Sequence, residues 1–276
     1  MPKVSVLLCA YNAEKYIAEA INSTIQQTYQ DFEFIIVDDG STDNTLQIIN
    51  GYTDSRIRLI RNPHDYINSL NVGLKACQGK YVLRMDADDI MDANRIEEQV
   101  KVMDDNSDIT VCTSWARTFG KDERIVGNIV QGKISDISTL FLLGNFLIHP
   151  SCMIRRRFLT RFHIKYKRYN YAEDFKLWTD IDKKGGIFYV IPHTLLSYRL
   201  SEQQVTHIRH QEQNATRLTI QQEIIEEKLK HLNPKYKQDI EQLYQQTLLI
   251  HKIGLLSADT IVGIMYGIFK NLQAKT

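Results

Sequence analysis

Three closely spaced aspartates end a short apolar run, and they are the side chains of this chain best suited to chemistry. Residues 81–85 predict a buried strand, because continuous apolar runs of this length are typical of parallel sheets covered on both faces. Asp86, Asp88 and Asp89 follow directly. Because side chains alternate along an extended chain, Asp86 and Asp88 are expected to point to the same side.

Two such carboxylates repel each other unless a cation or hydrogen-bond donors neutralise them. A divalent cation that prefers oxygen ligands, Mg²⁺ or Mn²⁺, fits this Asp-x-Asp pattern. Open α/β sheets also bind their ligands at the carboxyl ends of strands. The alternative is a solvated loop in which an aspartate caps the next helix.

A second acid pair, Asp38 and Asp39, ends the apolar run 34–37. Gly40 and a Ser/Thr cap then open a helix. Strands are predicted near 4–9, 34–37, 57–60, 81–85 and 109–112, with amphipathic segments between them. This alternation predicts a mostly parallel, Rossmann-like sheet flanked by helices, with right-handed crossovers. Both acid clusters should therefore lie along one edge of the sheet.

The pattern is less regular after about residue 115. A short helix is expected within 134–143, a strand at 152–154 and further strands at 187–191 and 195–200. Glu173 and Asp174 open another helix, where the helix dipole favours carboxylates, so capping is an alternative to catalysis. Seven cationic residues fall within 155–168. They could meet a diphosphate-linked lipid or anionic headgroups, or form a solvated loop.

Composition limits the function classes. The chain has 276 residues, 43% of them hydrophobic, and a net charge of +1, so it has no global attraction to nucleic acid or anionic lipid. Its four cysteines lie far apart and predict reduced, mostly buried thiols of a cytosolic protein. Neither a signal peptide nor an apolar run of about 18 residues is evident, which predicts a cytoplasmic protein.

From about residue 211 onward the chain is predicted to be helical, which gives a helical C-terminal appendage. Its last helix carries one apolar stripe, comprising Ile261, Ile264, Met265, Ile268, Phe269 and Leu272. This stripe could lie in a membrane interface and hold the protein peripherally on the inner face of the cell membrane. The alternative is packing on its own protein.

The chain resembles the family-2 glycosyltransferases of the GT-A fold. The landmarks are Ala10-Tyr11-Asn12, Val37-Asp38-Asp39-Gly40-Ser41-Thr42-Asp43, Arg84-Met85-Asp86-Ala87-Asp88-Asp89, His149-Pro150-Ser151 and Glu173-Asp174. They stand in the family's order over roughly residues 4–200. The resemblance implies a GT-A catalytic domain over 1–205, with a donor half at about 1–115 and an acceptor half at about 116–205. Residues 206–276 form the helical extension.

The resemblance also implies the reaction and its partners. A nucleotide-sugar, usually a UDP-sugar, donates a sugar to a hydroxyl of a saccharide or of a polyprenyl-diphosphate-linked acceptor in polysaccharide biosynthesis. The resemblance implies inversion of configuration at the anomeric carbon and a bound Mn²⁺ or Mg²⁺. The Gln-x-x-Arg-Trp pattern of processive synthases is absent from the sequence, so one sugar per encounter is expected.

Individual roles follow from positions that match the family. Ala10, Tyr11 and Asn12 resemble the nucleotide-binding segment, and Asp39 resembles the acceptor for the nucleobase. Asp86 resembles the acid that serves the ribose or metal, and Asp88 the direct metal ligand. Asp174 resembles the catalytic base, with Glu173 and His149 as supporting or acceptor-side residues.

One departure concerns the metal. Many relatives have a histidine shortly after a Tyr-Arg pair, whereas here Tyr198-Arg199 is followed by His207 and His210 only later. Glu202 or Gln203 could substitute for it, or a basic residue could hold the diphosphate.

Three other functions compete with this interpretation. A nucleotidyltransferase would show a Gly-rich basic loop after the first strand, which residues 9–12 lack. A haloacid-dehalogenase-like phosphatase carries its Asp-x-Asp on the first strand, not on about the fourth. A non-catalytic nucleotide-sugar-binding subunit of an assembly complex has no such counterargument in the sequence.

Overall fold

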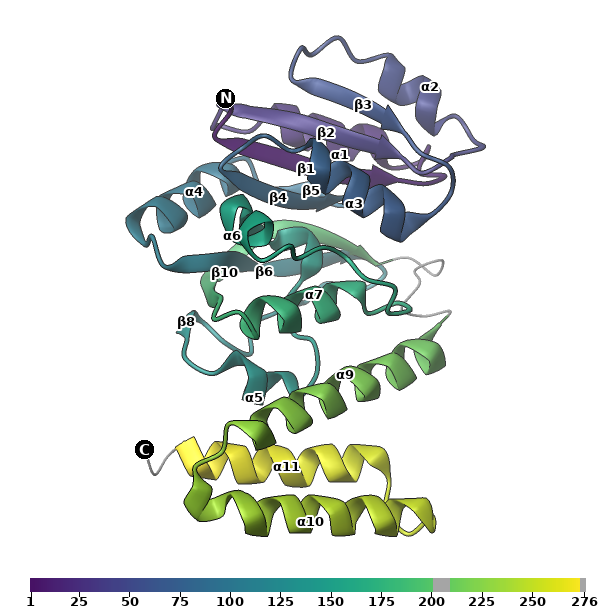
Figure 1. Cartoon of the computed structure of the whole chain (residues 1–276). Coiled ribbons are helices and arrows are strands. Elements are labelled where there is room, and N and C mark those ends of the chain that lie inside the picture. Colours follow the sequence, from purple (N-terminus) through teal and green to yellow (C-terminus); the bar gives the residue numbers. More distant parts are fainter. Residues whose placement is uncertain (201–208, 274–276) are drawn as a thin grey trace. The chain divides into compact units, whose positions relative to one another are not determined.

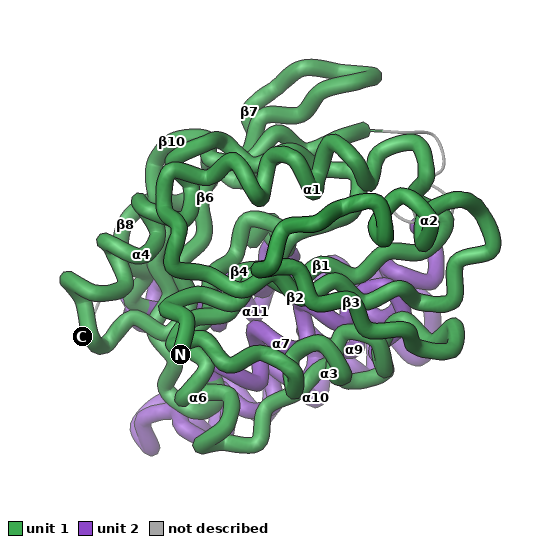
Figure 2. Tube along the Cα trace, turned by 90° about the horizontal axis from the view of Figure 1, so that it is seen from above, with its two compact units in different colours: residues 1–135, 146–168, 183–204 green, residues 136–145, 169–182, 205–276 purple. Residues whose placement is uncertain are grey.

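Strands and helices alternate from the N-terminus because apolar runs long enough to be buried on both sides are separated by amphipathic segments. A computed structural model of the chain (Figure 1) describes residues 1–200 and 209–273. The chain divides into two compact units, coloured in Figure 2. Unit 1 contains residues 1–135, 146–168 and 183–204, and unit 2 contains 136–145, 169–182 and 205–276.

Unit 1 contains the sheet. Its strands are β1 (Val4–Ala10), β2 (Phe32–Asp38), β3 (Ile57–Arg61), β4 (Tyr81–Asp86), β5 (Ile90–Met91), β6 (Ile109–Gly120), β7 (Ile125–Val126), β8 (Gly132–Ile134), β9 (Met153–Arg155) and β10 (Ile187–Leu200). Its helices are α1 (Ile17–Ile25), α2 (Thr45–Asn50), α3 (Tyr66–Ala76), α4 (Arg95–Asp105), the 3₁₀ turn η1 (His149–Ser151) and α6 (Arg156–Arg161).

The sheet is mixed, with the order β3-β2-β1-β4-β9-β6-β10-β5. Parallel pairing joins β3, β2, β1 and β4, as the alternation of strands and helices predicts. The short strand β9 runs antiparallel to both β4 and β6, whereas β6 and β10 are again parallel. The two strands expected at 187–191 and 195–200 are one strand, β10, with register shifts at its irregular points. The predicted α/β fold with a helical C-terminal part is confirmed.

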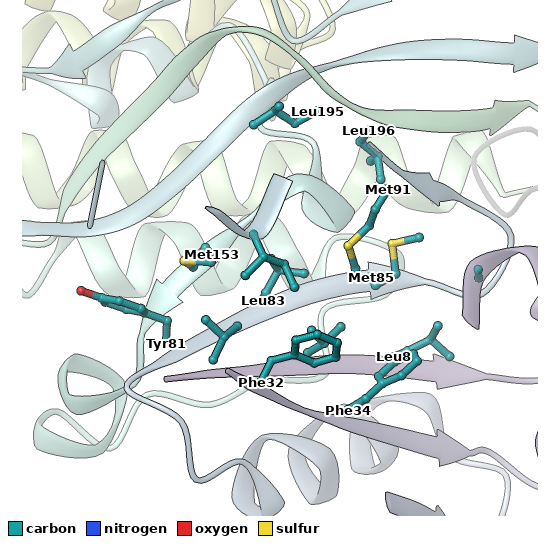
Figure 3. Packing of buried hydrophobic residues seen from close by; sticks show 14 of the residues in the cluster. Leu8, Phe32, Phe34, Tyr81, Leu83, Met85, Met91, Met153, Leu195 and Leu196 are labelled. Atoms are coloured by element: carbon teal, nitrogen blue, oxygen red, sulfur yellow. The ribbon is translucent and has the colours of Figure 1, made fainter. Parts of the chain in front are cut away.

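The core of unit 1 lies on the sheet, where side chains from neighbouring strands meet. Leu8 of β1, Phe34 of β2 and Leu83 of β4 are fully buried in one cluster (Figure 3). Met85 and Met153 complete it from β4 and β9. Every residue of β1 is buried, which is the burial expected of a continuous apolar run in a doubly covered parallel sheet.

All four cysteines are buried and unpaired by disulfides. Burial raises the pKa of Cys9 and of Cys77 to about 12, so both thiols stay protonated at neutral pH. The cysteines therefore behave as small core side chains, as their spacing predicted.

Gly79 marks a close approach between two backbone segments. A Cβ at this position would lie 2.6 Å from the backbone nitrogen of Ser5 and 2.7 Å from the carbonyl carbon of Val4. We expect Gly79→Ala to lower the free energy of unfolding by about 1–3 kcal/mol, because β1 would have to move. Urea unfolding followed by circular dichroism measures this change.

Gly263 of α11 (Ala258–Gln273) is the matched control, since a Cβ there would meet nothing within 4 Å. Gly263→Ala should stabilise the protein by up to about 1 kcal/mol through helix propensity. Equal effects of the two substitutions would contradict the close approach at Gly79.

Unit 2 is helical. It contains α5 (Ile137–Phe141), α7 (Glu173–Asp182), α9 (His210–Lys230), α10 (Pro234–Lys252) and α11 (Ala258–Gln273). Compactness thus places α5 and α7 with the C-terminal helices, whereas the sequence interpretation divides the chain at residue 205. Hydrogen bonds join α5 to the C-terminal helices, since Gln221 of α9 donates to the backbone carbonyls of Phe141 and Leu142.

The apolar stripe of α11 mostly faces its own unit. Ile261, Met265 and Phe269 are buried, while Ile264 is 36% exposed. The self-packing alternative therefore accounts for the buried part of the stripe, and membrane contact stays a prediction. Among the described helices, none combines the length and the apolar character needed to span a bilayer.

Candidate active site

The carboxyl ends of three adjacent parallel strands bring the predicted donor-site residues together. In the register of the sheet Ala10 pairs with Asp38, and Cys9 pairs with Asp86. The segments 10–12, 38–39 and 86–89 therefore lie along one edge of unit 1, which we call the acidic rim. Parallel strands produce this edge because their carboxyl ends all point the same way.

The loops after β1 and β2 hold each other in place. The Asn12 side chain accepts a hydrogen bond from the Thr42 backbone N–H at 2.8 Å, and the Asn12 N–H donates to Ser41 Oγ at 3.1 Å. Thr45 Oγ1 accepts from the backbone N–H of Ala13 at 2.7 Å. The side chain of Asn12 is thus engaged in shaping the rim, while Tyr11 next to it is 46% exposed.

Asp39 is buried at the rim and held by several donors. Its Oδ1 accepts hydrogen bonds from Ser69 Oγ at 2.6 Å and from the backbone N–H of Asp65 at 2.8 Å. Its Oδ2 lies 3.0 Å from Nδ1 of His64. The His64 ring also stacks on Tyr11, with 4.0 Å between the ring centroids. The sequence interpretation assigned no contact to His64 or Ser69.

Arg84 supports the acidic loop from inside the sheet. Its side chain is 2% exposed, and its Nη2 donates to Asp86 Oδ1 at 2.5 Å and to Tyr66 Oη at 3.2 Å. Burial opposes the positive charge, but the Asp86 carboxylate together with Tyr66, Cys9 and Tyr166 outweighs it and holds the pKa of Arg84 well above its usual range. Asp86 is therefore partly neutralised by a fixed cation.

The described residues compensate a negative charge on Asp88 or Asp89 less completely than one on Asp86. Burial, followed by the charge of Asp86, raises the pKa of Asp88 to about 6. Asp89 is fully buried, and burial together with Asp86 and Asp88 holds its pKa well above the usual range. Its Oδ1 accepts from the Arg199 backbone N–H at 2.8 Å, whereas Oδ2 has no hydrogen-bond donor among residues 1–200 and 209–273.

These carboxylates fit a hard divalent cation. Within the described part of the chain, no group of three His, Cys, Asp or Glu side chains could hold a metal ion. Mg²⁺ in phosphate-dependent enzymes is typically bound by one or two carboxylates together with substrate phosphates, so a complete protein cage is not required. The crowded oxygens of Asp86 and Asp88 supply such a partial donor set.

Arg199 ties the acidic loop to two other elements of unit 1. Its Nε donates to the Asp88 carbonyl at 2.7 Å, and its Nη2 donates to Glu19 of α1 at 2.7 Å. Its Cζ lies 4.3 Å from the ring centroid of Tyr16 and 4.4 Å from that of Phe119. The sequence marked this position only as the residue before an expected histidine.

Arg199→Lys keeps the charge but removes the planar fork that reaches these acceptors. We expect the dissociation constant for UDP in the presence of Mn²⁺ to rise about 5- to 10-fold, because loss of one or two net hydrogen bonds loosens the loop. Calorimetry measures this change. Arg124→Lys, at an exposed ion pair with Asp122, is the matched control. If Arg199→Lys binds UDP as tightly as the wild type, Arg199 does not order the acidic loop for nucleotide binding.

The sequence suggests Glu202 or Gln203 in place of the histidine expected after Tyr198-Arg199. Glu202, Gln203 and His207 lie outside the described residues. His210 is exposed at the start of α9 in unit 2.

His149 lies in η1, and its Nε2 is 2.9 Å from the hydroxyl of Tyr166. Burial and the charge of Arg84 hold the pKa of His149 well below its usual range, so the ring is neutral at physiological pH. Tyr166 in turn is fixed by Asn71, whose side-chain Nδ2 donates to its carbonyl at 2.9 Å. An acceptor-side role for His149 stays a prediction.

The cationic stretch 155–168 has two kinds of members. Arg155 is buried and donates to the backbone carbonyls of Met103 and Ile109 at 2.8 Å, so it is structural. Arg156 likewise donates to the carbonyl of Gly79. Arg168 is 70% exposed and pairs with Asp65. The two arginines that begin the stretch are therefore engaged by backbone carbonyls.

Asp174 opens α7 in unit 2. Its Oδ2 accepts from Asn145 Nδ2 at 2.8 Å, and its Oδ1 accepts from the Phe175 backbone N–H at 2.6 Å. Asn145 is a neighbour that the sequence did not indicate. Glu173 lies in the same first turn. Because these residues belong to unit 2, their convergence with the acidic rim of unit 1 stays a prediction.

Comparison with known proteins identifies the family. Residues 5–162 match the model of the family described as "Glycosyl transferase family 2". An uncharacterized glycosyltransferase of Haemophilus influenzae is 40% identical over 81% of this chain and 73% of its own length. The Escherichia coli "UDP-Glc:alpha-D-GlcNAc-diphosphoundecaprenol beta-1,3-glucosyltransferase WfgD" is 31% identical over 76% of this chain and 81% of its own length.

Among solved structures, S. aureus TarS, residues 1–349, in complex with UDP, has a TM-score of 0.64. The match covers 85% of this chain and 68% of TarS at 22% identity. This likeness shows a shared fold.

Proposed function

The chain is a member of glycosyl transferase family 2, and we propose that it transfers one sugar from a UDP-sugar to a hydroxyl of a saccharide or lipid-linked oligosaccharide. The observation that carries this proposal is the acidic rim. Asp39 and Asp86–Asp89 lie at the carboxyl ends of β2 and β4, the two strands that flank β1, within the residues that match the family. A nucleotide-sugar needs such an arrangement, with an acceptor for its base and compensation for its diphosphate.

The proposed nucleotide contacts follow from the described geometry. Asp39 is buried and oriented by Ser69 and Asp65, so its Oδ2 is positioned to accept from a ring N–H of a base. Tyr11 offers an aromatic face beside it. The choice of uracil is supported by two relatives, WfgD and WfaP of Escherichia coli, whose names specify UDP-Glc, and by the UDP in the TarS complex.

Asp88 and Asp86 would hold Mn²⁺ or Mg²⁺, since their crowded oxygens form the partial donor set described above. When bound, the ion would stabilise the negative charge that develops on the departing nucleoside diphosphate. The protein itself contributes Arg84, which fixes Asp86, and Arg199, which fixes the loop of Asp88.

Asp174 is the proposed base. The acceptor oxygen forms a bond to the anomeric carbon, the bond from that carbon to the diphosphate oxygen breaks, and the hydroxyl proton passes to the Asp174 carboxylate. Asn145 and the Phe175 N–H orient this carboxylate, and the N-terminus of α7 favours its ionised form. A single displacement from the face opposite the leaving group inverts the anomeric configuration.

The proposed acceptor is a polyprenyl-diphosphate-linked saccharide used in polysaccharide biosynthesis. WfgD and WfaP are named for acceptors of this class. Such a lipid would bring the reaction to the inner face of the cell membrane. The protein would then work in the cytoplasm with peripheral membrane contact.

A thermal-shift screen tests the donor side. UDP at about 100 times its dissociation constant should stabilise the folded protein by about 2.7 kcal/mol, which corresponds to roughly 5–10 °C in Tm for a chain of this size. The shift should be larger with Mn²⁺ and smaller with ADP or GDP. If no nucleoside diphosphate or nucleotide-sugar raises the Tm, with or without Mn²⁺, the proposal is wrong.

Transfer is then measured with UDP-sugars and a lipid-diphosphate-linked acceptor. Release of UDP that depends on the acceptor indicates an enzyme. Tight donor binding without transfer or hydrolysis would instead indicate a non-catalytic binding subunit.

A further inference from the structure

The His64 side chain makes both of the contacts that the proposed function assigns to the nucleobase. We propose that His64 occupies the place of the base when the donor site is unliganded, so that an incoming base must displace it. This inference rests on the proposed function, because it concerns the same nucleotide site. It makes His64 an internal competitor that sets the affinity for the base.

The hydrogen bonds define the state of the ring. Nδ1 of His64 lies 3.0 Å from Asp39 Oδ2 and 3.1 Å from the Asp39 backbone carbonyl oxygen. Both neighbours are acceptors, so Nδ1 carries a hydrogen in this geometry and donates it. A ring N–H of a pyrimidine base would donate to the same carboxylate.

The stacking contact duplicates the second base interaction. The rings of His64 and Tyr11 are 4.0 Å apart at their centroids and inclined by 24°. The two rings are stacked, which is how a flat base would pack on the same face of tyrosine. Base and imidazole would therefore compete for one face and for one carboxylate.

The other oxygen of Asp39 offers the base no alternative. Oδ1 already accepts from Ser69 Oγ and from the Asp65 N–H, which uses its two lone pairs. A base that pairs with Asp39 must therefore approach Oδ2, where His64 stands.

The local backbone holds the histidine at the rim while leaving its ring able to move. The Asn62 N–H donates to the Asp38 carbonyl at 2.9 Å, and the Asp65 N–H donates to Asp39. Gly40, at φ +77°, permits this approach, because a Cβ at this position would lie 3.1 Å from the backbone nitrogen of His64. The His64 side chain is 59% exposed, so rotation about χ1 would carry the ring into water.

His64→Ala is the direct test, and calorimetry is the measurement. Removing the competitor should lower the dissociation constants for uridine and for UDP by the same factor, about 3- to 10-fold, since one net hydrogen bond and a stacking contact no longer oppose binding. Inorganic pyrophosphate with Mn²⁺ makes no base contact, so its affinity should not change. His193→Ala, another exposed histidine of unit 1, is the matched control and should bind uridine like the wild type.

A spectroscopic readout follows the ring in the unmodified protein. With ¹⁵N-labelled histidine, the His64 signals, assigned by their absence in His64→Gln, should move on addition of UDP, because Nδ1–H leaves the carboxylate for water. Pyrophosphate with Mn²⁺ should not produce this change.

Weaker or unchanged binding of uridine by His64→Ala would overturn the inference. His64 would then either contact the bound base or have no effect on base binding. Unchanged His64 signals in UDP-saturated wild-type protein would also overturn it. A wild-type protein that binds neither UDP nor any nucleotide-sugar would instead contradict the proposed function itself.

Discussion

Asp174→Asn is expected to lower kcat at least ~100-fold, the scale of lost general-base assistance, while donor binding stays close to that of the wild type. Asparagine keeps the size of the side chain but cannot accept the hydroxyl proton. Oδ1 is the position that accepts from the Phe175 N–H, and an amide oxygen placed there preserves this contact, while the Asn145 amide can turn so that its oxygen accepts from the new NH2 group. The defect should therefore appear in turnover, not in folding or in UDP affinity. Steady-state transfer assays and UDP calorimetry on the same preparation measure the two quantities.

Asp239→Asn is the matched control, because it makes the same chemical change at an exposed position of α10 in the same unit. It should leave kcat unchanged. Turnover by Asp174→Asn within a few-fold of the wild type would exclude Asp174 as the base. Loss of UDP binding in this variant would show that Asp174 acts on the donor.

Asp88→Ala should raise the dissociation constant for UDP measured with Mn²⁺ by at least ~10-fold. Loss of a residue that only supports a metal ligand already weakens metal binding on this scale, so loss of a direct ligand should weaken it at least as much. Without added metal, wild type and variant should bind UDP alike. The fold should not suffer, because burial and the neighbouring Asp86 already disfavour the charge of Asp88 in the folded protein. Calorimetry at several Mn²⁺ concentrations, together with urea unfolding, separates these effects.

Asp105→Ala removes a carboxylate from the exposed end of α4 and serves as the control. If Asp88→Ala keeps the full Mn²⁺ dependence of UDP binding, Asp88 does not hold the ion. If both proteins bind UDP equally with and without Mn²⁺, the donor site does not use a metal.

The position of the acidic rim could be predicted from the sequence because it depends on local rules. Apolar runs bury as strands, and helices between them impose parallel pairing, so Asp38–Asp39 and Asp86–Asp89 must come out at the same edge. No knowledge of distant contacts was needed for that step. The wide spacing of the four cysteines likewise predicted reduced, mostly buried thiols.

The partners of these acids could not be predicted in this way. His64 and Ser69 reach Asp39 from the loop after β3 and from α3, 25 and 30 residues further along the chain. Arg199 reaches the Asp88 carbonyl from β10, 111 residues away. A lone His, Ser or Arg has no spacing pattern that announces such a contact, because the contact arises only when separate elements pack.

The sequence by itself therefore determined the fold class, the family and the edge at which the carboxylates gather, since each is encoded by periodicity and by motifs in order. Only the tertiary structure decided that β9 enters the sheet antiparallel between β4 and β6, and that α5 and α7 group with the C-terminal helices. It also decided which donors hold Asp39 and Asp89. The reason is that the charge and orientation of a carboxylate depend on whatever lies within a few ångströms, and folding brings those neighbours from anywhere in the chain.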